Sequence, residues 1–167
     1  MNSKKYLTIF LTLLVLVTTI GCDQASKHIV RKHLSYSETI ALISNYFTLT
    51  RIENKGAFLS LGDSLADPLR FLFLSVLPML ALFFGLLFLF INSRLTGTTR
   101  LGLCFFIGGG IGNIYDRIVH GSVTDFLHID LGIVQTGIFN MADVSIMFGM
   151  MILLINFFRS DELTWKN

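Results

Sequence analysis

Two aspartates in apolar surroundings, Asp125 in the stretch VTDF and Asp143 in the stretch FNMAD, could carry out chemistry if the chain brings them together. Two neighbouring carboxyl groups cannot both ionise at low cost, so one keeps a proton while the other can take a proton from water. Such a pair supplies a base that activates water and an acid that polarises a carbonyl group or protonates a leaving nitrogen. This is the equipment of an aspartic peptidase.

Further polar residues accompany these two acids at helical spacing. In GGGIGNIYDR, Asn113, Asp116 and Arg117 stand at positions i, i+3 and i+4, which predicts that they share one helix face. Asn140 and Asp143 stand at i and i+3 and should also share a face. The adjacent arginine suits Asp116 to an ion pair or a hydrogen-bond anchor better than to a shared proton, so we predict a supporting role for this acid.

Metal and serine chemistry have little support in the sequence. The motifs HExxH and GxSxG are absent. The four histidines lie in or next to segments that we expect outside the membrane, where a solvated histidine needs no ligand. We expect no cofactor, and a hard cation held by carboxylates alone stays a minor alternative.

The segments that must position these residues are strongly apolar. Of the 167 residues, 53% are hydrophobic and 14% are charged, and the mean hydropathy of +0.68 indicates a membrane protein. Four apolar runs are long enough, or nearly so, to cross a hydrocarbon core of roughly 30 Å. We therefore predict an all-α, four-helix transmembrane bundle in a single domain, residues 1–167, with spans at about Tyr6–Cys22, Leu69–Ile91, Leu101–Val119 and Phe139–Phe158.

The segment between the first and second spans, residues 23–68, has a different pattern. Its stretch TIALISNYFTLTRIENKGAFLSLG is rich in Ile, Leu, Phe, Tyr and Thr, with turn signals at Ser44–Asn45 and Asn54–Gly56. Short strands fit this composition better than another span. We predict a small extracytoplasmic β-rich segment that could cradle an extended peptide, cover a lipid-accessible cleft or simply cap the bundle.

Charge distribution predicts the orientation in the membrane. An even number of spans places both termini on one side, and Lys or Arg stands before the first span, in the short loop 92–100 and after the fourth span. Under the positive-inside rule, both termini should be cytoplasmic. The net charge of +2, with no block of Lys and Arg, gives no reason to expect a nucleic-acid partner.

The helical rise predicts the depth of each acid. Asp23 is about 26 Å and Asp116 about 22 Å from the inner ends of their spans, and Asp143 is about 6 Å from the outer end of its span. We expect these acids to cluster near the outer face. Asp125, in the loop beyond the third span, should fold back over Asp143.

Small residues in the third span could hold this cluster together. Gly108 and Gly112 form a GxxxG pattern, which lets another helix backbone approach closely. The pattern is common in membrane helices, and simple packing explains it as well.

Five motifs stand in one order along the chain. They are DQASK (Asp23–Lys27), NKGAF (Asn54–Phe58), GGGIGNIYDR (Gly108–Arg117), VTDF (Val123–Phe126) and FNMAD (Phe139–Asp143). With the four spans, these motifs make nearly the whole chain resemble the lipoprotein signal peptidases, also called signal peptidase II or prolipoprotein signal peptidase. The second motif departs from that family's usual N-x-G-A-A-F, since Leu59 stands where Phe or Trp is usual.

The resemblance implies an intramembrane aspartic endopeptidase of the bacterial cytoplasmic (inner) membrane, with its active site near the outer face. Its implied substrates are diacylglyceryl-modified prolipoproteins, from which the signal peptide is removed just before the lipidated Cys. Membrane lipids are the other implied partner, and no metal or organic cofactor is implied. Asp125 and Asp143 would be the catalytic pair. The implied substrate-binding or supporting residues are Asp23, Lys27, Asn54, Gly56, Asn113, Asp116, Arg117, Asn140 and Ala142.

Three other interpretations remain. The stretch Val17–Cys22, VTTIGC, is similar to the end of a lipoprotein signal peptide whose Cys22 would be lipidated, but Thr19 stands where that motif prefers Leu or Val. We therefore expect Cys22 to end the first span. The buried acids could instead form a proton or cation relay in a transporter, although nothing charged continues such a path into the inner half of any span. In a non-enzymatic assembly factor, the polar residues would only bind helices together.

Overall fold

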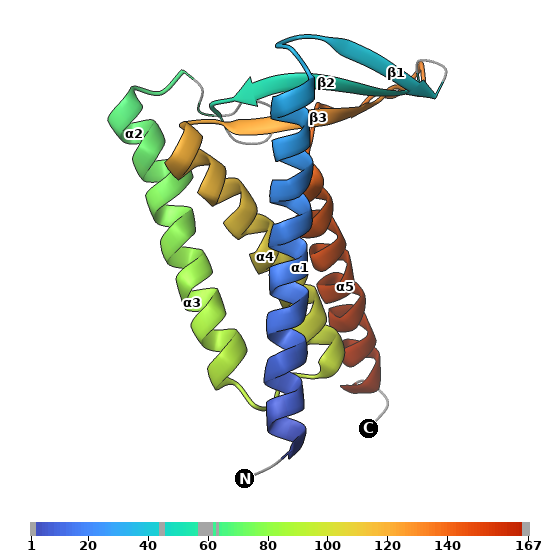
Figure 1. Cartoon of the computed structure of the whole chain (residues 1–167). Coiled ribbons are helices and arrows are strands. Elements are labelled where there is room, and N and C mark those ends of the chain that lie inside the picture. Colours follow the sequence, from blue (N-terminus) through green and yellow to red (C-terminus); the bar gives the residue numbers. More distant parts are fainter. Residues whose placement is uncertain (1–2, 44–45, 57–61, 63, 165–167) are drawn as a thin grey trace.

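A computed structural model gives the fold of residues 3–43, 46–56, 62 and 64–164. Four long helical segments stand side by side, and a small sheet lies across one end of them (Figure 1). The first helix begins, and the last helix ends, at the opposite end of the bundle. The helices are α1 (Ser3–His33), α2 (Asp67–Phe71), the π-helical turn η2 (Leu72–Val76), α3 (Leu77–Ile91), α4 (Gly97–His120) and α5 (Met141–Thr164). The strands are β1 (Thr39–Ile43), β2 (Phe47–Asn54) and β3 (Val123–Ile129).

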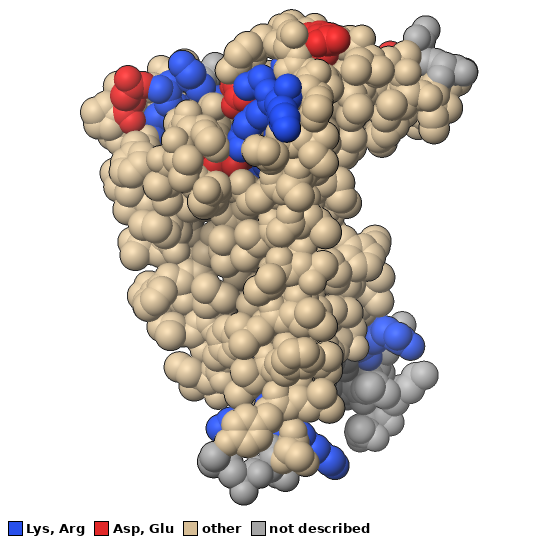
Figure 2. Space-filling view, in the orientation of Figure 1, with Lys and Arg blue, Asp and Glu red and all other residues tan. Residues whose placement is uncertain are grey.

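Three helical segments in the described part of the chain are long and apolar enough to cross a membrane. They are Ser3–His33, Asp67–Ile91 and Met141–Arg159. On the face drawn in Figure 2, charged side chains gather at the two ends of the molecule and leave a band without Lys, Arg, Asp or Glu between them. The predicted helical membrane fold is thus confirmed. α4 has 24 residues, but its glycines and its Asn113, Asp116 and Arg117 lower its hydropathy, and a fourth span formed by α4 stays a prediction.

The first helix is longer than the sequence predicted. α1 does not end at Cys22 but continues to His33. Asp23, Lys27 and Arg31 follow one another at four-residue intervals, so they extend one polar stripe along the helix. Its last turn contains Arg31, Lys32 and His33, which suit the negative end of a helix dipole. Cys22 is an exposed residue inside this helix.

Consecutive glycines place α4 at the centre of the bundle. At each of Gly108–Gly110, an added Cβ atom would lie within 3.0 Å of a different helix, or closer. Both glycines of the GxxxG pattern, Gly108 and Gly112, face α1, and Gly112 lies against Asp23. This face of α4 therefore contacts side chains of α1. Gly108 faces Thr19 of α1, Gly109 faces Ala142 of α5 and Gly110 faces Leu82 of α3.

The sheet has the antiparallel order β1-β2-β3. β1 and β2 confirm the strands predicted between the first two spans. β3 was expected to be a loop, and its strand conformation depends on pairing with β2, which is distant in sequence. In this pairing, Ile52 lies opposite Asp125 and Glu53 lies opposite Thr124. The predicted turn at Ser44–Asn45 and the residues Ala57 to Leu59 lie outside the described residues.

The sheet is fixed to the bundle by a small apolar cluster. Val30 and Leu34 near the end of α1 pack with Phe126 of β3, and all three side chains are buried. A second cluster, deeper in the bundle, contains Leu16 of α1 and Ile107 of α4. β3 is therefore held against the C-terminal end of α1.

Candidate active site

Lys27 of α1 is the centre of a buried charge cluster. Its Nζ lies 2.8 Å from Asp23 Oδ2, 3.0 Å from Asp116 Oδ2 and 2.9 Å from Asn113 Oδ1. The side chains of Lys27, Asp23 and Asp116 are 0% exposed. Arg31 adds a second positive charge, with its Nη2 2.9 Å from Asp116 Oδ1. Two positive charges thus face two negative charges, as a buried cluster requires.

The partners of Asp116 differ from the sequence prediction. The prediction paired this acid with Arg117, whereas the structure pairs it with Lys27 and Arg31. Adjacent residues of a helix point about 100° apart, so Arg117 faces elsewhere. Its Nη2 donates to the Gly56 carbonyl oxygen at 2.9 Å. Asp116 therefore occupies the position of an ion-pair anchor, with partners from another helix.

Asn140 and Asp143 form the N-terminal cap of α5. The Asp143 backbone N–H donates to Asn140 Oδ1 at 3.0 Å, and the Asn140 N–H donates to Asp143 Oδ2 at 3.1 Å. This reciprocal pair is a capping box. The sequence predicted that Asn140 and Asp143 share a helix face. Asn140 instead precedes α5, which begins at Met141, so this prediction was wrong. The Ala142 N–H donates to Asp23 Oδ1 at 2.9 Å, so α1 also holds the first turn of α5.

Asp125 projects from β3 and is only 5% exposed. Its Oδ1 accepts from Asn140 Nδ2 at 2.7 Å and its Oδ2 accepts from Asn54 Nδ2 at 3.0 Å. Asn54 is itself oriented by the Gly56 N–H, which donates to Asn54 Oδ1 at 2.9 Å. Burial, with a contribution from the Asp143 charge, raises the pKa of Asp125 to about 6 despite these donors.

Two asparagines connect the two acids. Asn140 contacts both of them, Asp125 through its side chain and Asp143 through its backbone. Asn113 Nδ2 donates to Asp143 Oδ1 at 2.9 Å, and Asn113 Oδ1 accepts from Asn140 Nδ2 at 3.2 Å. Asp125 and Asp143 therefore lie on either side of one amide bridge, from a strand and a helix respectively.

Every residue that the sequence suggested for the site belongs to one connected network of hydrogen bonds and ion pairs. Gln24, Arg31, Glu53 and Thr124 also belong to it and had not been identified. The four-residue spacing from Asp23 through Lys27 could have indicated Arg31. Glu53 and Thr124 directly precede Asn54 and Asp125, but neither position had a recognisable pattern.

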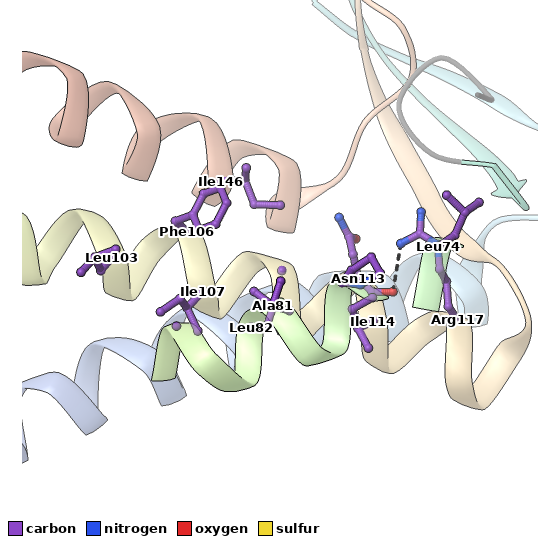
Figure 3. Close-up of a pocket in the computed structure, with 13 residues that line it drawn as sticks. Leu74, Ala81, Leu82, Leu103, Phe106, Ile107, Asn113, Ile114, Arg117 and Ile146 are labelled. Atoms are coloured by element: carbon purple, nitrogen blue, oxygen red, sulfur yellow. Dashed lines mark hydrogen bonds between the residues drawn. The ribbon is translucent and has the colours of Figure 1, made fainter. Parts of the chain in front are cut away.

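A cavity of about 370 Å³ lies beside the network, between α3, α4 and α5. Its walls are mostly apolar, and Asn113 and Arg117 are its polar residues (Figure 3). Leu82 and Ile107 lie on facing walls of α3 and α4. The site therefore joins a polar, carboxylate-bearing end to an apolar space within the bundle.

Among the residues that the structure describes, no group of three or more His, Cys, Asp and Glu side chains is placed to hold a metal ion.

Known proteins similar to this chain point to one family. The family described as signal peptidase (SPase) II matches residues 15–159. The lipoprotein signal peptidase of Clostridioides difficile (strain 630) is 37% identical over 146 residues, which cover 87% of this chain and 93% of that protein. The lipoprotein signal peptidase of Gloeobacter violaceus is 34% identical over 151 residues, which cover 90% of this chain and 83% of that protein.

Solved structures have the same fold. One bacterial membrane enzyme solved at 2.3 Å has a TM-score of 0.82 at 22% identity and covers 92% of this chain and 90% of its own. Another, solved at 1.9 Å, has a TM-score of 0.77 at 24% identity and covers 89% of this chain and 93% of its own. At these identities, the likeness supports the fold alone.

Proposed function

Because the chain belongs to the signal peptidase II family, we propose that it is an aspartic endopeptidase that cuts diacylglyceryl-modified prolipoproteins just before the lipidated Cys. The family makes it a membrane protease of lipoprotein processing and does not favour the ion-transport alternative. The observation that carries the aspartic mechanism is the bridge of Asn140 between Asp125 and Asp143.

In the proposed reaction, the two acids have different tasks. Asp143 lies in the first turn of α5, where the helix dipole favours a negative charge, and it acts as the base. Asp125 acts as the acid, because burial raises its pKa to about 6 and so favours the protonated form. The network of asparagines holds both groups toward one space.

The proton transfers follow from these tasks. Asp143 takes a proton from water while the water oxygen attacks the carbonyl carbon before the lipidated Cys, and Asp125 gives its proton to the carbonyl oxygen. The tetrahedral intermediate then breaks its C–N bond. The proton held by Asp143 passes to the leaving nitrogen, and Asp125 recovers its proton from the hydroxyl group. Both acids return to their starting states.

The cavity and the sheet have the properties that a lipidated peptide requires. The apolar walls between α3, α4 and α5 suit the hydrocarbon parts of such a substrate, and Arg117 and Asn113 supply polar contacts near the peptide. β2 and β3 lie across the end of the bundle opposite the two termini (Figure 1). We assign the sheet the task of covering the peptide bond that is cut. The buried charges of Asp23, Lys27 and Asp116 hold Asn113 and the first turn of α5 in place.

The topology of the proposed enzyme has α4 as a fourth span and both termini in the cytoplasm. Basic residues at the end of the bundle opposite the sheet support this orientation (Figure 2). The carboxylate pair then faces the outer surface of the bacterial cytoplasmic membrane, with membrane lipids around the apolar helical segments.

A cleavage assay with purified protein in detergent tests the proposal. The substrate is a diacylglyceryl-modified prolipoprotein, and cleavage is followed by gel shift. Asp125→Asn and Asp143→Asn should fold and fail to cut, Asp116→Asn should keep part of the turnover, and EDTA should have no effect. The matched control is Asp130→Asn, an acid of the 130–135 turn that accepts from the Gly132 N–H at 2.8 Å and should cut at the wild-type rate. Cleavage by Asp125→Asn, or no cleavage by the wild type, would overturn the proposal.

A further inference from the structure

β3 carries a second buried polar residue directly before Asp125. Thr124 is 0% exposed. Its Oγ1 donates to Glu53 Oε1 at 2.9 Å and accepts from Arg31 Nε at 2.8 Å. Its backbone N–H donates to Asp116 Oδ2 at 3.4 Å. Successive side chains of a strand point to opposite faces, so Thr124 is bound on the face away from Asp125.

Glu53 of β2 holds this part of β3 through both of its carboxylate oxygens. Oε1 accepts from Thr124 Oγ1, and Oε2 accepts from Ser122 Oγ at 2.7 Å. Arg51 Nη2 lies 3.4 Å from Oε1. The two hydroxyl donors stand on either side of Val123, which is itself buried. One side chain therefore fixes both ends of a three-residue stretch that leads into Asp125.

The same helix positions both acids of the proposed pair. α1 reaches Asp143 through Asp23, which accepts from the Ala142 N–H in the first turn of α5. α1 reaches the strand of Asp125 through Arg31, which donates to Thr124. Asp125 on β3 and Asp143 on α5 are thus both positioned relative to α1.

We propose that Glu53 and Thr124 are positioning residues, which fix the register and height of β3 against α1 so that Asp125 faces Asp143. This inference rests on the proposed function. Displacement of a reacting group by about 1 Å can cost as much as a hundredfold in rate, so a clamp on the opposite face of the strand affects turnover without touching substrate.

The test separates positioning from folding and from substrate binding. Thr124→Val keeps the shape of the side chain but removes the hydroxyl group, whereas Thr124→Ser keeps the hydroxyl group. We expect Thr124→Val to lower kcat by roughly tenfold or more with KM changed by less than about twofold. Thr124→Ser should restore kcat to within about threefold of the wild type. Thr50→Val is the matched control, because the Thr50 hydroxyl bonds the exposed Thr39 hydroxyl at 2.8 Å, on the β1 side of the sheet.

A double-variant cycle tests whether Glu53 acts through Thr124. Glu53→Ala should lower kcat like Thr124→Val, and the combined variant should be no slower than the slower single variant, because both changes break the same contact. Glu53→Ala also serves as the test if Thr124→Val fails to fold. A folded Thr124→Val or Glu53→Ala protein with wild-type kcat would overturn the inference, as would an effect on KM alone or multiplicative effects in the double variant.

The cleavage assay distinguishes a wrong positioning role for Glu53 and Thr124 from a wrong aspartic mechanism. Asp125→Asn and Asp143→Asn are measured in the same assay. If either still cuts, the aspartic mechanism is wrong. If both are inert while Thr124→Val cuts at the wild-type rate, only the clamp is wrong.

Discussion

Replacing Lys27 with methionine tests whether charge balance holds the site together. Lys27→Met keeps the length of the side chain but removes the positive charge that contacts Asp23, Asp116 and Asn113 at 2.8–3.0 Å. Asp116 retains Arg31 at 2.9 Å. Among the residues that the structure describes, Asp23 retains neutral donors alone, Gln24 Nε2 at 3.0 Å and the Ala142 N–H at 2.9 Å. The variant therefore leaves Asp23 as a buried charge without a counterion.

The size of the effect follows from this geometry. Removing one partner of a buried ion pair costs about 3–5 kcal/mol. For a chain of this size, about 1 kcal/mol corresponds to about 2–4 °C in Tm, so Tm should fall by roughly 6–20 °C. Lys32→Met removes the same charge from an exposed position of α1 and should leave Tm within about 2 °C.

A second substitution distinguishes charge from packing. Asp23→Asn added to Lys27→Met removes the orphaned charge, and the double variant should be more stable than Lys27→Met alone by about 1 kcal/mol or more. Thermal unfolding in detergent at pH 7 measures each Tm. If the double variant unfolds at or below the temperature of Lys27→Met, or if Lys27→Met unfolds like the wild type, the charge-balance argument is wrong.

Three further results are expected. In Gly112→Ala, the new Cβ would overlap Asp23 Oδ2, so Tm should fall by several degrees. In the control Gly21→Ala, the new Cβ has open space, and the protein should gain up to about 1 kcal/mol of stability. Equal Tm values for the two variants would contradict this. Asp125 has its pKa raised to about 6 by burial, so its ionisation opposes folding. Wild-type stability should therefore fall relative to Asp125→Asn by roughly 2 kcal/mol as the pH rises from about 4 to about 7; a constant difference between the two Tm values across this range would refute it. Asn140→Ser keeps a good helix cap but loses the amide bridge, so cleavage should slow at least about tenfold, with a loss of stability of about 1–3 kcal/mol from the buried Asp125 oxygen that loses its donor; wild-type cleavage would show that the bridge is dispensable.

Local patterns predicted the parts of the fold that depend on local sequence. Apolar runs predicted the helical segments, and β-branched and aromatic residues predicted β1 and β2. β3 could not be predicted in this way, because its partners on β2 are about 70–80 residues away. The extension of α1 beyond Cys22 was missed because its polar stripe gains its contacts only when α4 and β3 pack against it.

The chemistry of the site was more predictable than its connections. Spacing and depth indicated the acids, Asn113 and Asn140, and the resemblance to signal peptidase II added Asn54, Gly56 and Ala142 to the residues that the structure brings together. The partner of Asp116 was wrong because proximity in sequence was taken for proximity in space. Glu53 was missed because its importance comes from lying opposite Thr124 in the sheet, which a single sequence does not encode in any short motif.

The contacts of Lys27 also have a consequence for how the chain enters the membrane. The bond from Lys27 to Asp23 lies within one helix turn of α1, so it can form as soon as this segment is synthesised. Asp116 arrives later, on α4, at a surface that already presents Lys27 and Arg31. α5 is made last and brings the Ala142 N–H to the remaining oxygen of Asp23. Asp23 and Lys27 can therefore compensate each other within α1, and Asp116 arrives later at the two positive charges with which it pairs.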